Sequence, residues 1–476
     1  MALLATRPAR RPLDLGRHDY APRHRGLWRR PRQGGDLPVA TLLYALAVTV
    51  NLLSVWAVSG PDVLTGEEMS VSFRDGVFLA ERAQASVWST NVAGHLFFLA
   101  ASWLDPAYGL FGGRWWKAVA MALLPVLVYV VLRRRLGCRV LGSLLGGITT
   151  ALLPGVQVFG WIAIEAGLEA VAGVAALLLA TSRRAGWWAA PIVGGISVML
   201  YPSGLAWLAV VLLVCLCRTV RADHRARAAV FVGAATAIAV LLYVAPLLWW
   251  RTGARHIGAG GGTVEGDPGT NFATLLDQLT VSGDSYYYFG DQPGLGSVWL
   301  AAAVVAAGLV LPAARSGALP WLTVAVVTVA MWLPAGNMPG LRRAVAIPVV
   351  AAIVLGATVD VLWRRRPGST SALVLGMACA AVVLPLVDTL ASWQQAYHSG
   401  RDALVADFTI DAGPMSATFA RFHSDLAAGR ETAETMVARH DGIRTLAVVW
   451  RLAEESGDTA GIPDPEEIVR ACLPAP

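Results

Sequence analysis

The sequence predicts an all-α protein that crosses a membrane about eleven times, and three observations lead to this fold class. Of the 476 residues, 56% are hydrophobic, and the mean hydropathy is +0.56. A soluble domain is far less apolar than this. Apolar runs recur along the chain, and most approach the roughly 20 residues that span a bilayer. Short arginine clusters separate the runs, which is the pattern that sets the topology of membrane proteins.

The chain begins with a basic arm and a membrane anchor. Residues 1–36 are rich in Arg and Pro and are expected to form a disordered cytoplasmic arm. The first apolar run covers 37–58, and no small-residue cleavage site follows it, so we expect a signal anchor that stays on the protein. The remaining crossings are predicted at 115–132, 140–158, 163–181, 187–200, 205–217, 228–250, 297–313, 318–334, 344–363 and 370–390.

The run at 91–104 decides the topology of everything that follows it. It is too short to span a bilayer comfortably. If it does not cross, the later arginine clusters all lie in the cytoplasm with the basic arm, as the positive-inside rule requires. We therefore expect an interfacial or re-entrant helix on the outer face, after an amphipathic helix near 69–85. These clusters are Arg133-Arg134-Arg135, Arg183-Arg184, the run from Arg218 to Arg227, Arg315 and Arg364-Arg365-Arg366.

This topology gives three regions: the arm, a transmembrane domain over 37–390 and a polar tail over 391–476. The domain has a first outer loop at 60–114 and a second at 251–294. The short runs at 187–200 and 205–217 have arginines at both ends, so we expect a hairpin of two crossings with a broken turn at Tyr201-Pro202-Ser203-Gly204. The odd number of crossings places the tail outside a plasma membrane. Tryptophan pairs such as Trp187-Trp188 lie at segment ends, where their rings favour the interface.

Acids and arginines on the predicted outer face are candidate site residues. Glu67 and Glu68 open the first outer loop, either as solvated acids at a helix amino end or as a general base. Arg342 and Arg343 lie at the outer end of a helix, against the positive-inside trend, and either bind phosphate or anchor the helix by snorkelling. Arg114 heads another helix on the same face, where a phosphate or acceptor role is open.

The order of these features resembles the GT-C superfamily of integral membrane glycosyltransferases. The similarity is to its branch of protein O-mannosyltransferases and lipid A aminoarabinose transferases, over about 38–350. Four stretches carry it: Gly66-Glu67-Glu68, where that branch has an Asp-Glu pair; Asn91-Val92-Ala93-Gly94-His95-Leu96-Phe97-Phe98, where members read His-Pro-Pro-Leu; Gly113-Arg114 onward to Ile164-Glu165-Ala166; and Leu341-Arg342-Arg343 onward to Pro348, which is similar to the Arg-Tyr…Pro opening of a late helix. The chain departs from the family in its first acid, its missing Pro-Pro pair and the absence of Tyr after Arg343.

The resemblance implies transfer of a sugar, with inversion, from a polyprenyl-phosphate donor to a glycan, lipid or protein acceptor at the outer face of the bilayer. It implies that Glu67 or Glu68 is the base and that Arg342, Arg343 and Arg114 bind the donor phosphate. Some members use a divalent cation, but the acids and histidines are scattered here. The sequence therefore indicates no metal site and no cofactor but leaves a divalent cation open, and its dispersed basic clusters indicate no nucleic-acid partner.

Four further residues are candidates for contact with the substrate. Glu165 lies in a turn between two crossings, as an ionisable group at membrane depth or as a wet loop acid. His95 lies in the re-entrant segment, as a satisfied interior polar group or as a catalytic one. Tyr287 and Asp284 lie in the loop 251–294, where aromatic rings flanked by acids suit sugar recognition; this loop is either a gate over the donor or a plain surface loop.

Three other functions are compatible with a multipass chain. A lipid or solute transporter predicts repeated halves with broken helices near the midplane. A polysaccharide polymerase or ligase predicts catalytic arginines in a large outer loop. A degenerate transferase would serve as a structural partner. The sequence shows no convincing internal repeat, and its polar residues gather on the predicted outer face, which favours the transferase.

Overall fold

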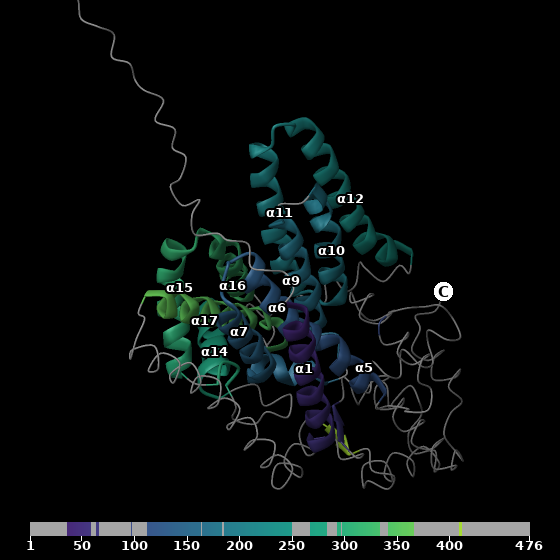
Figure 1. Cartoon of the computed structure of the whole chain (residues 1–476). Coiled ribbons are helices and arrows are strands. Elements are labelled where there is room, and N and C mark those ends of the chain that lie inside the picture. Colours follow the sequence, from purple (N-terminus) through teal and green to yellow (C-terminus); the bar gives the residue numbers. More distant parts are fainter. Residues whose placement is uncertain are drawn as a thin grey trace, which may run out of the picture.

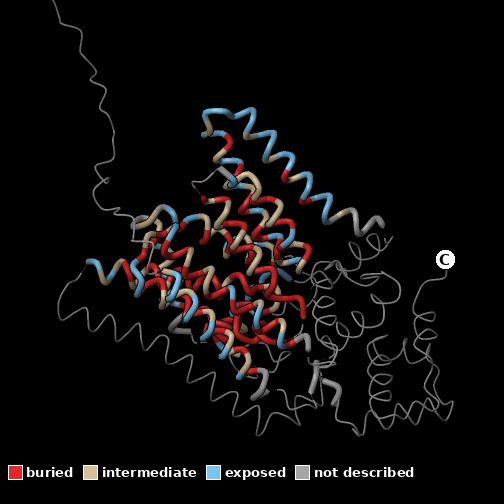
Figure 2. Tube along the Cα trace, turned by 45° about the vertical axis from the view of Figure 1, so that its right-hand side comes forward, coloured by how far each residue is buried: buried red, intermediate tan, exposed pale blue. Residues whose placement is uncertain are grey.

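The computed structural model of the chain describes residues 36–58, 63–65, 97, 112–162, 164–182, 185–249, 267–282, 293–296, 298–333, 341–365 and 409–411. In these parts the fold is a bundle of helices with one short two-stranded ladder (Figure 1). Buried residues gather in the middle of the bundle, whereas α12 is exposed over much of its length (Figure 2). The prediction of an all-α architecture is confirmed at this level.

The first two predicted crossings are helical. The anchor forms α1 (Asp36–Val58), and the run at 115–132 forms α5 (Gly112–Met121) and α6 (Leu123–Arg134). Together α5 and α6 make one apolar stretch long enough to span a bilayer. α1 packs against both of them and against the next helix.

The crossing predicted at 140–158 is bent. It consists of α7 (Val140–Leu152), α8 (Pro154–Gln157) and the 3₁₀ turn η5 (Val158–Gly160). The bend of 66° follows Leu153, whose backbone is extended. Pro154 causes it, because a residue before proline is disfavoured in the helical region.

The crossing predicted at 163–181 begins too early, because the helix observed there starts only at Leu168. Residues 164–167 form a turn, and α9 (Leu168–Ala180) begins only after it. Gly167 has a φ of +96°, a conformation that glycine adopts without steric cost. A Cβ there would lie 3.0 Å from the Cβ of Phe159. The turn agrees with the predicted position of Glu165 between two crossings, whereas the start of the helix was predicted too early because the run is apolar from residue 163.

The broken turn predicted around 201–204 joins two helices, of which only the second has the length of a membrane crossing. After the 3₁₀ turn η6 (Ala185–Ala189), α10 (Ala190–Leu200) leads to α11 (Gly204–Arg221). Tyr201 between them is extended, as expected for a residue before proline. α12 (Arg225–Trp249) then returns along α10, and the α11–α12 turn extends beyond the rest of the bundle (Figure 1).

The loop predicted at 251–294 contains a helix, α14 (Pro268–Thr280). Asp267 caps it by accepting a hydrogen bond of 2.8 Å from the Thr270 backbone N–H, and Pro268 suits the first helical position. The remaining elements are α15 (Val298–Ala314), η8 (Ser316–Ala318), α16 (Leu319–Trp332), η9 (Leu341–Arg343) and α17 (Ala346–Arg365).

Small residues bring α7 and α17 together in the middle of the bundle. A Cβ on Gly356 would lie 2.5 Å from the Gly142 carbonyl oxygen and 3.1 Å from the Cα of Gly146. Gly142 and Gly146 are four residues apart, so they share one face of α7. Small residues at this spacing let helix backbones approach closely in membrane proteins.

The apolar helices have the length and composition of a membrane protein. In the described parts of the chain, five helices are long and apolar enough to cross a bilayer, or six if the bent pair at α7 and α8 is one span. α9 and α16 are apolar but shorter. The eleven predicted crossings are therefore not all present as long helices, and the last one, at 370–390, lies outside the described residues, as do the basic arm and the helix at 69–85.

Several of the predicted cytoplasmic arginines meet at one end of the bundle, which we call the arginine-rich end. Asp360 of α17 is buried there and pairs with Arg315 and, at 2.9 Å, with Arg364. Its other oxygen accepts a 2.7 Å hydrogen bond from the Arg139 backbone N–H. Arg133 pairs with Asp36 at 2.9 Å. The structure thus brings together clusters that the positive-inside rule assigned to one side.

The ladder joins the first outer loop to the tail. β1 (Val63–Thr65) pairs antiparallel with β2 (Thr409–Asp411), with Leu64 opposite Ile410. It lies at the end of α1 that is remote from Asp36 (Figure 1). The ladder therefore brings together two segments that are far apart in the sequence.

Candidate functional site

Two cations at the start of α5 are fully buried at the end of the bundle opposite the arginine-rich end. Arg114 and Lys117 each have no exposed side-chain surface. Lys117 Nζ donates hydrogen bonds to the carbonyl oxygens of Ile164 and, at 2.6 Å, Ala166. The Arg114 guanidinium carbon lies 5.2 Å from the ring centroid of Trp161, within cation–π range. Both cations therefore contact the segment 161–167.

Two buried acids lie in this segment and directly after it. Glu165 lies between the two carbonyl groups that Lys117 binds, and Glu169 is in the first turn of α9. Their exposed fractions are 6% and 1%. Buried ionisable groups cost free energy unless they are paired or hydrogen-bonded. The four buried ionisable side chains in this small region, two cations and two acids, therefore make it a candidate functional site.

Glu169 acts as a clamp between three parts of the chain. Its carboxylate accepts hydrogen bonds from the Gly167 backbone N–H at 2.5 Å and from Ser203 Oγ at 2.9 Å. Its backbone carbonyl accepts a hydrogen bond from Ser197 Oγ at 2.7 Å. Glu169 thus ties the 164–167 turn to the broken turn between α10 and α11. Glu165 and Glu169 do not share one helical face, because α9 begins after Glu165.

α1 holds the other side of the site. Asn51 Nδ2 donates a 2.9 Å hydrogen bond to the Ala118 carbonyl of α5, and Gly160 packs so closely on Asn51 that an added Cβ would lie 2.8 Å from Oδ1. Gln157 Nε2 donates a hydrogen bond to Ser54 Oγ. These contacts fix η5 and α5 relative to each other, and with them Trp161 and Arg114.

Arg342 and Arg343 belong to η9, directly before α17, which agrees with their predicted place at the head of a late helix. Both are half-buried, whereas Leu341 is buried against Gly294. The Gly294 carbonyl in turn accepts a 3.0 Å hydrogen bond from the Gly155 N–H of α8. η9 therefore lies beside the bend of the α7–α8 span, at the same end of the bundle as Arg114 and Glu165.

The structure describes four of the nine predicted site residues, namely Arg114, Glu165, Arg342 and Arg343. Glu67, Glu68, His95, Asp284 and Tyr287 lie outside the described residues. Within the described parts of the chain, no group of three His, Cys, Asp or Glu side chains could hold a metal ion.

Sequence reasoning missed three residues that build the site: Lys117, Asn51 and Gln157. Each is a polar side chain inside an apolar run, and such residues in membrane helices mark functional or structural polar contacts. Lys117 is also the only lysine of the chain. These three residues were therefore recognisable as polar residues within apolar runs, but the sequence did not indicate which partner each would contact.

Chemically, the arrangement combines guanidinium and ammonium groups with carboxylates in a dry environment. Arginine suits phosphate because its planar donors match phosphate oxygens, and charges act more strongly where water is excluded. A carboxylate on a fixed turn can orient or accept a proton from a hydroxyl group. No protein-family model and no curated protein matches the chain.

Proposed function

We propose that the protein transfers a sugar from a polyprenyl-phosphate donor to an acceptor at the outer face of the plasma membrane, with inversion. The observation that carries the proposal is the convergence of buried Arg114 and Lys117 on the turn that bears Glu165. This polar site lies at the end of an apolar helical bundle, opposite the arginine-rich end. A donor anchored by its lipid and recognised by its phosphate needs a cationic site at such a place.

The proposed topology has eleven crossings, a cytoplasmic amino terminus and an extracytoplasmic tail. The clustering of Arg133, Arg315 and Arg364 at one end supports a shared cytoplasmic side. The β1–β2 ladder supports placing the tail with the first outer loop, because the ten crossings proposed between them are an even number. In this proposed topology, Arg114, Glu165, Arg342 and Arg343 lie at the outer face.

In the proposed reaction, an acceptor hydroxyl or amine attacks the anomeric carbon of the donor sugar. The bond from that carbon to the phosphate oxygen breaks, and its electron pair leaves with the phosphate. Arg114, Arg342 and Arg343 stabilise the negative charge of the leaving phosphate. The acceptor proton passes to Glu67 or Glu68, and Glu165 orients a sugar or acceptor hydroxyl, with His95, Tyr287 and Asp284 as further contacts.

Sugar transfer in isolated membranes tests this function. The membranes receive a panel of radiolabelled polyprenyl-phosphate sugars, and the wild type is compared with Glu67→Gln plus Glu68→Gln and with Arg114→Gln. We expect the double variant to lose transfer by about a hundredfold or more and Arg114→Gln to bind donor more weakly. Arg134→Gln, an exposed arginine at the other end, is the control and retains full activity.

The outcomes separate the competing functions. Transfer that survives in the double variant would move the base to another residue, with Glu165 the next to test. Absence of transfer by the wild type with every donor, together with movement of a labelled lipid or solute across the membrane, would favour a transporter. Polymer growth from a lipid-linked glycan in place of single-sugar transfer would favour a polymerase.

A further inference from the structure

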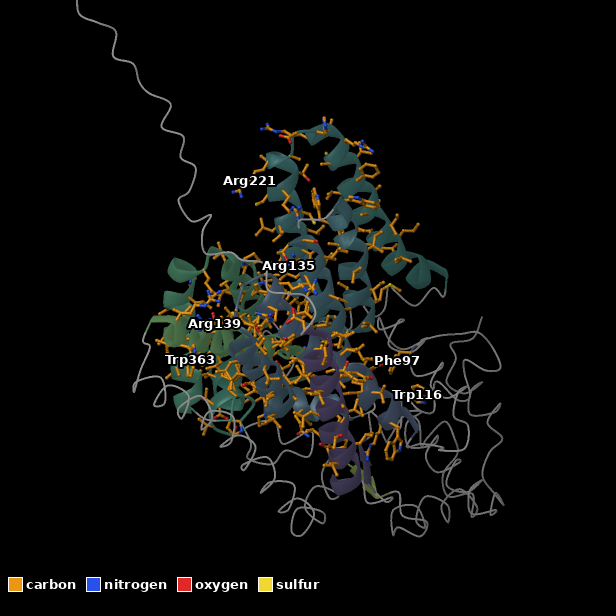
Figure 3. The ribbon with its side chains drawn as sticks, in the orientation of Figure 1. Phe97, Trp116, Arg135, Arg139, Arg221 and Trp363 are labelled. Atoms are coloured by element: carbon orange, nitrogen blue, oxygen red, sulfur yellow. The ribbon has the colours of Figure 1, made fainter. Side chains whose placement is uncertain are left out.

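We propose that the turn between α11 and α12 binds the headgroup of an anionic phospholipid, independently of the transferase function. The turn, which we call the basic tip, comprises residues 218–227 and contains four arginines against one aspartate, Asp223, together with His224. Arg221, Arg225 and Arg227 are exposed, as are Asp223 and His224. The tip extends beyond the rest of the bundle, and Arg221 lies far from Arg135 and Arg139 (Figures 1 and 3).

The arginines of the basic tip differ from those of the arginine-rich end in what they contact. At the arginine-rich end, Arg133 forms an ion pair with Asp36, and Arg315 and Arg364 form ion pairs with Asp360. In the described parts of the chain, no ion pair engages Arg221 or Arg225. Topology control accounts for arginines at this end, but it does not explain why no acid among the described residues pairs with these two. Their charge is available to an anion from outside.

Aromatic rings lie against the two other arginines of the basic tip. The guanidinium carbon of Arg218 lies 4.5 Å from the Trp187 ring centroid, and that of Arg227 lies 5.5 Å from the Phe231 centroid. Trp188 stacks on Phe231 with centroids 5.1 Å apart. Tryptophan favours the boundary between headgroups and acyl chains. The ring layer therefore marks the level at which a lipid headgroup would meet the basic tip.

The helix faces next to the tip are apolar and exposed. Leu216 and Val220 on α11 are 60% and 56% exposed, and Val230 on α12 is 69% exposed. A phospholipid matches both parts of this surface, because its acyl chains would cover the apolar faces while its phosphate meets the arginines. An acidic soluble protein would match only the charges. The combination therefore favours an anionic lipid as the occupant.

Native mass spectrometry of the purified full-length protein in detergent tests the proposal. Phosphatidylglycerol and phosphatidylcholine with identical acyl chains are titrated against wild type, the tip variant Arg221→Gln plus Arg225→Gln, and the control Arg134→Gln plus Arg139→Gln. Each arginine near an anionic lipid surface contributes about a fivefold change in affinity. We expect the tip variant to bind phosphatidylglycerol about tenfold or more weakly, with phosphatidylcholine unchanged and the control within about twofold of wild type.

The control removes the same charge from exposed arginines at the arginine-rich end and keeps the Arg139 backbone contact with Asp360. Thermal unfolding of each variant in phosphatidylcholine checks that all of them fold alike. Added salt should weaken phosphatidylglycerol binding to wild type. Equal phosphatidylglycerol affinity of wild type and tip variant would overturn the proposal. The proposal would also be overturned if the control variant lost as much phosphatidylglycerol affinity as the tip variant. Complete displacement of the lipid by a polyglutamate peptide at matched charge would overturn it as well.

Discussion

At the scale of single residues, the most informative group is Lys117. It is fully buried and donates to the carbonyls of Ile164 and Ala166, so it fixes the turn that presents Glu165. The candidate acid and arginine of this site were predictable from sequence, because ionisable residues in apolar runs stand out. The lysine that holds them together also stands out in an apolar run, but its partners were not predictable, because they are backbone atoms that no sequence pattern identifies.

Replacing Lys117 by Met should lower the free energy of unfolding by about 3 kcal/mol, because two buried carbonyl groups lose charged hydrogen bonds. Val119→Met is the matched control, since Val119 is on the same helix and is exposed, and it should change stability by less than about 0.5 kcal/mol. Unfolding in mixed detergent micelles measures both. Equal losses in the two variants would show that Lys117 does not support the turn.

Cys138, in the loop between α6 and α7, gives a prediction of pH dependence. Burial raises the pKa of its thiol to about 12, so the neutral form prevails at physiological pH. In a variant that keeps only this cysteine, alkylation at pH 8 should be about a thousandfold slower than for a free thiol, because only the thiolate reacts. The rate should still rise with pH above 9. A plateau near pH 9 would contradict the burial of this thiol.

At the scale of elements, the sequence predicts helices well and their breaks poorly. The runs that became α1, α11, α12 and α17 were found because apolar length is read directly from composition. The proline breaks at Pro154 and Pro202 are both visible in the sequence, but only the second was used. The turn that carries Glu165 was predicted, but the predicted crossing at 163–181 includes it, whereas α9 begins only at Leu168. The backbone of the turn is set by Gly167, whose φ of +96° no hydrophobic pattern records.

The crossing of α7 and α17 should not tolerate a side chain at Gly356. Its Cβ would lie 2.5 Å from a backbone oxygen of α7, which cannot move without separating the helices. We expect Gly356→Ala to cost about 2–3 kcal/mol of unfolding free energy. Gly308→Ala on α15, where the nearest atom would be 3.6 Å away, should be neutral or stabilising by up to about 1 kcal/mol. A neutral Gly356→Ala would show that this close approach is absent.

At the scale of the whole molecule, the two ends of the bundle have different chemistry. One end collects arginines that pair with Asp36 and Asp360, and the other carries Arg114, Lys117, Glu165 and Glu169 within an apolar frame. The positive-inside rule predicted from the sequence that most arginine clusters would lie at one end. The sequence could not predict that the first outer loop and the tail would pair as strands, because three-residue strands have no distinctive pattern.

The proposed orientation predicts which surface a membrane-impermeant maleimide reaches in spheroplasts. In a cysteine-free background, Ala273→Cys on exposed α14 should label without permeabilisation, because α14 lies at the end that carries the candidate site. His224→Cys in the basic tip should label only after the membrane is opened. The reverse pattern would place the candidate site in the cytoplasm and contradict the proposed outer-face reaction.

The proposed function requires that a polyprenyl phosphate binds with its phosphate beside Arg114. Photo-crosslinking tests it most directly, with a polyprenyl phosphate that carries a photoreactive group next to the phosphate and with peptide mapping of the labelled protein. We predict labelling of residues in 112–121 and 161–170, reduced at least tenfold in Arg114→Gln and unchanged in Arg134→Gln. Labelling that avoids both segments, or that is equal in the two variants, would contradict the claim.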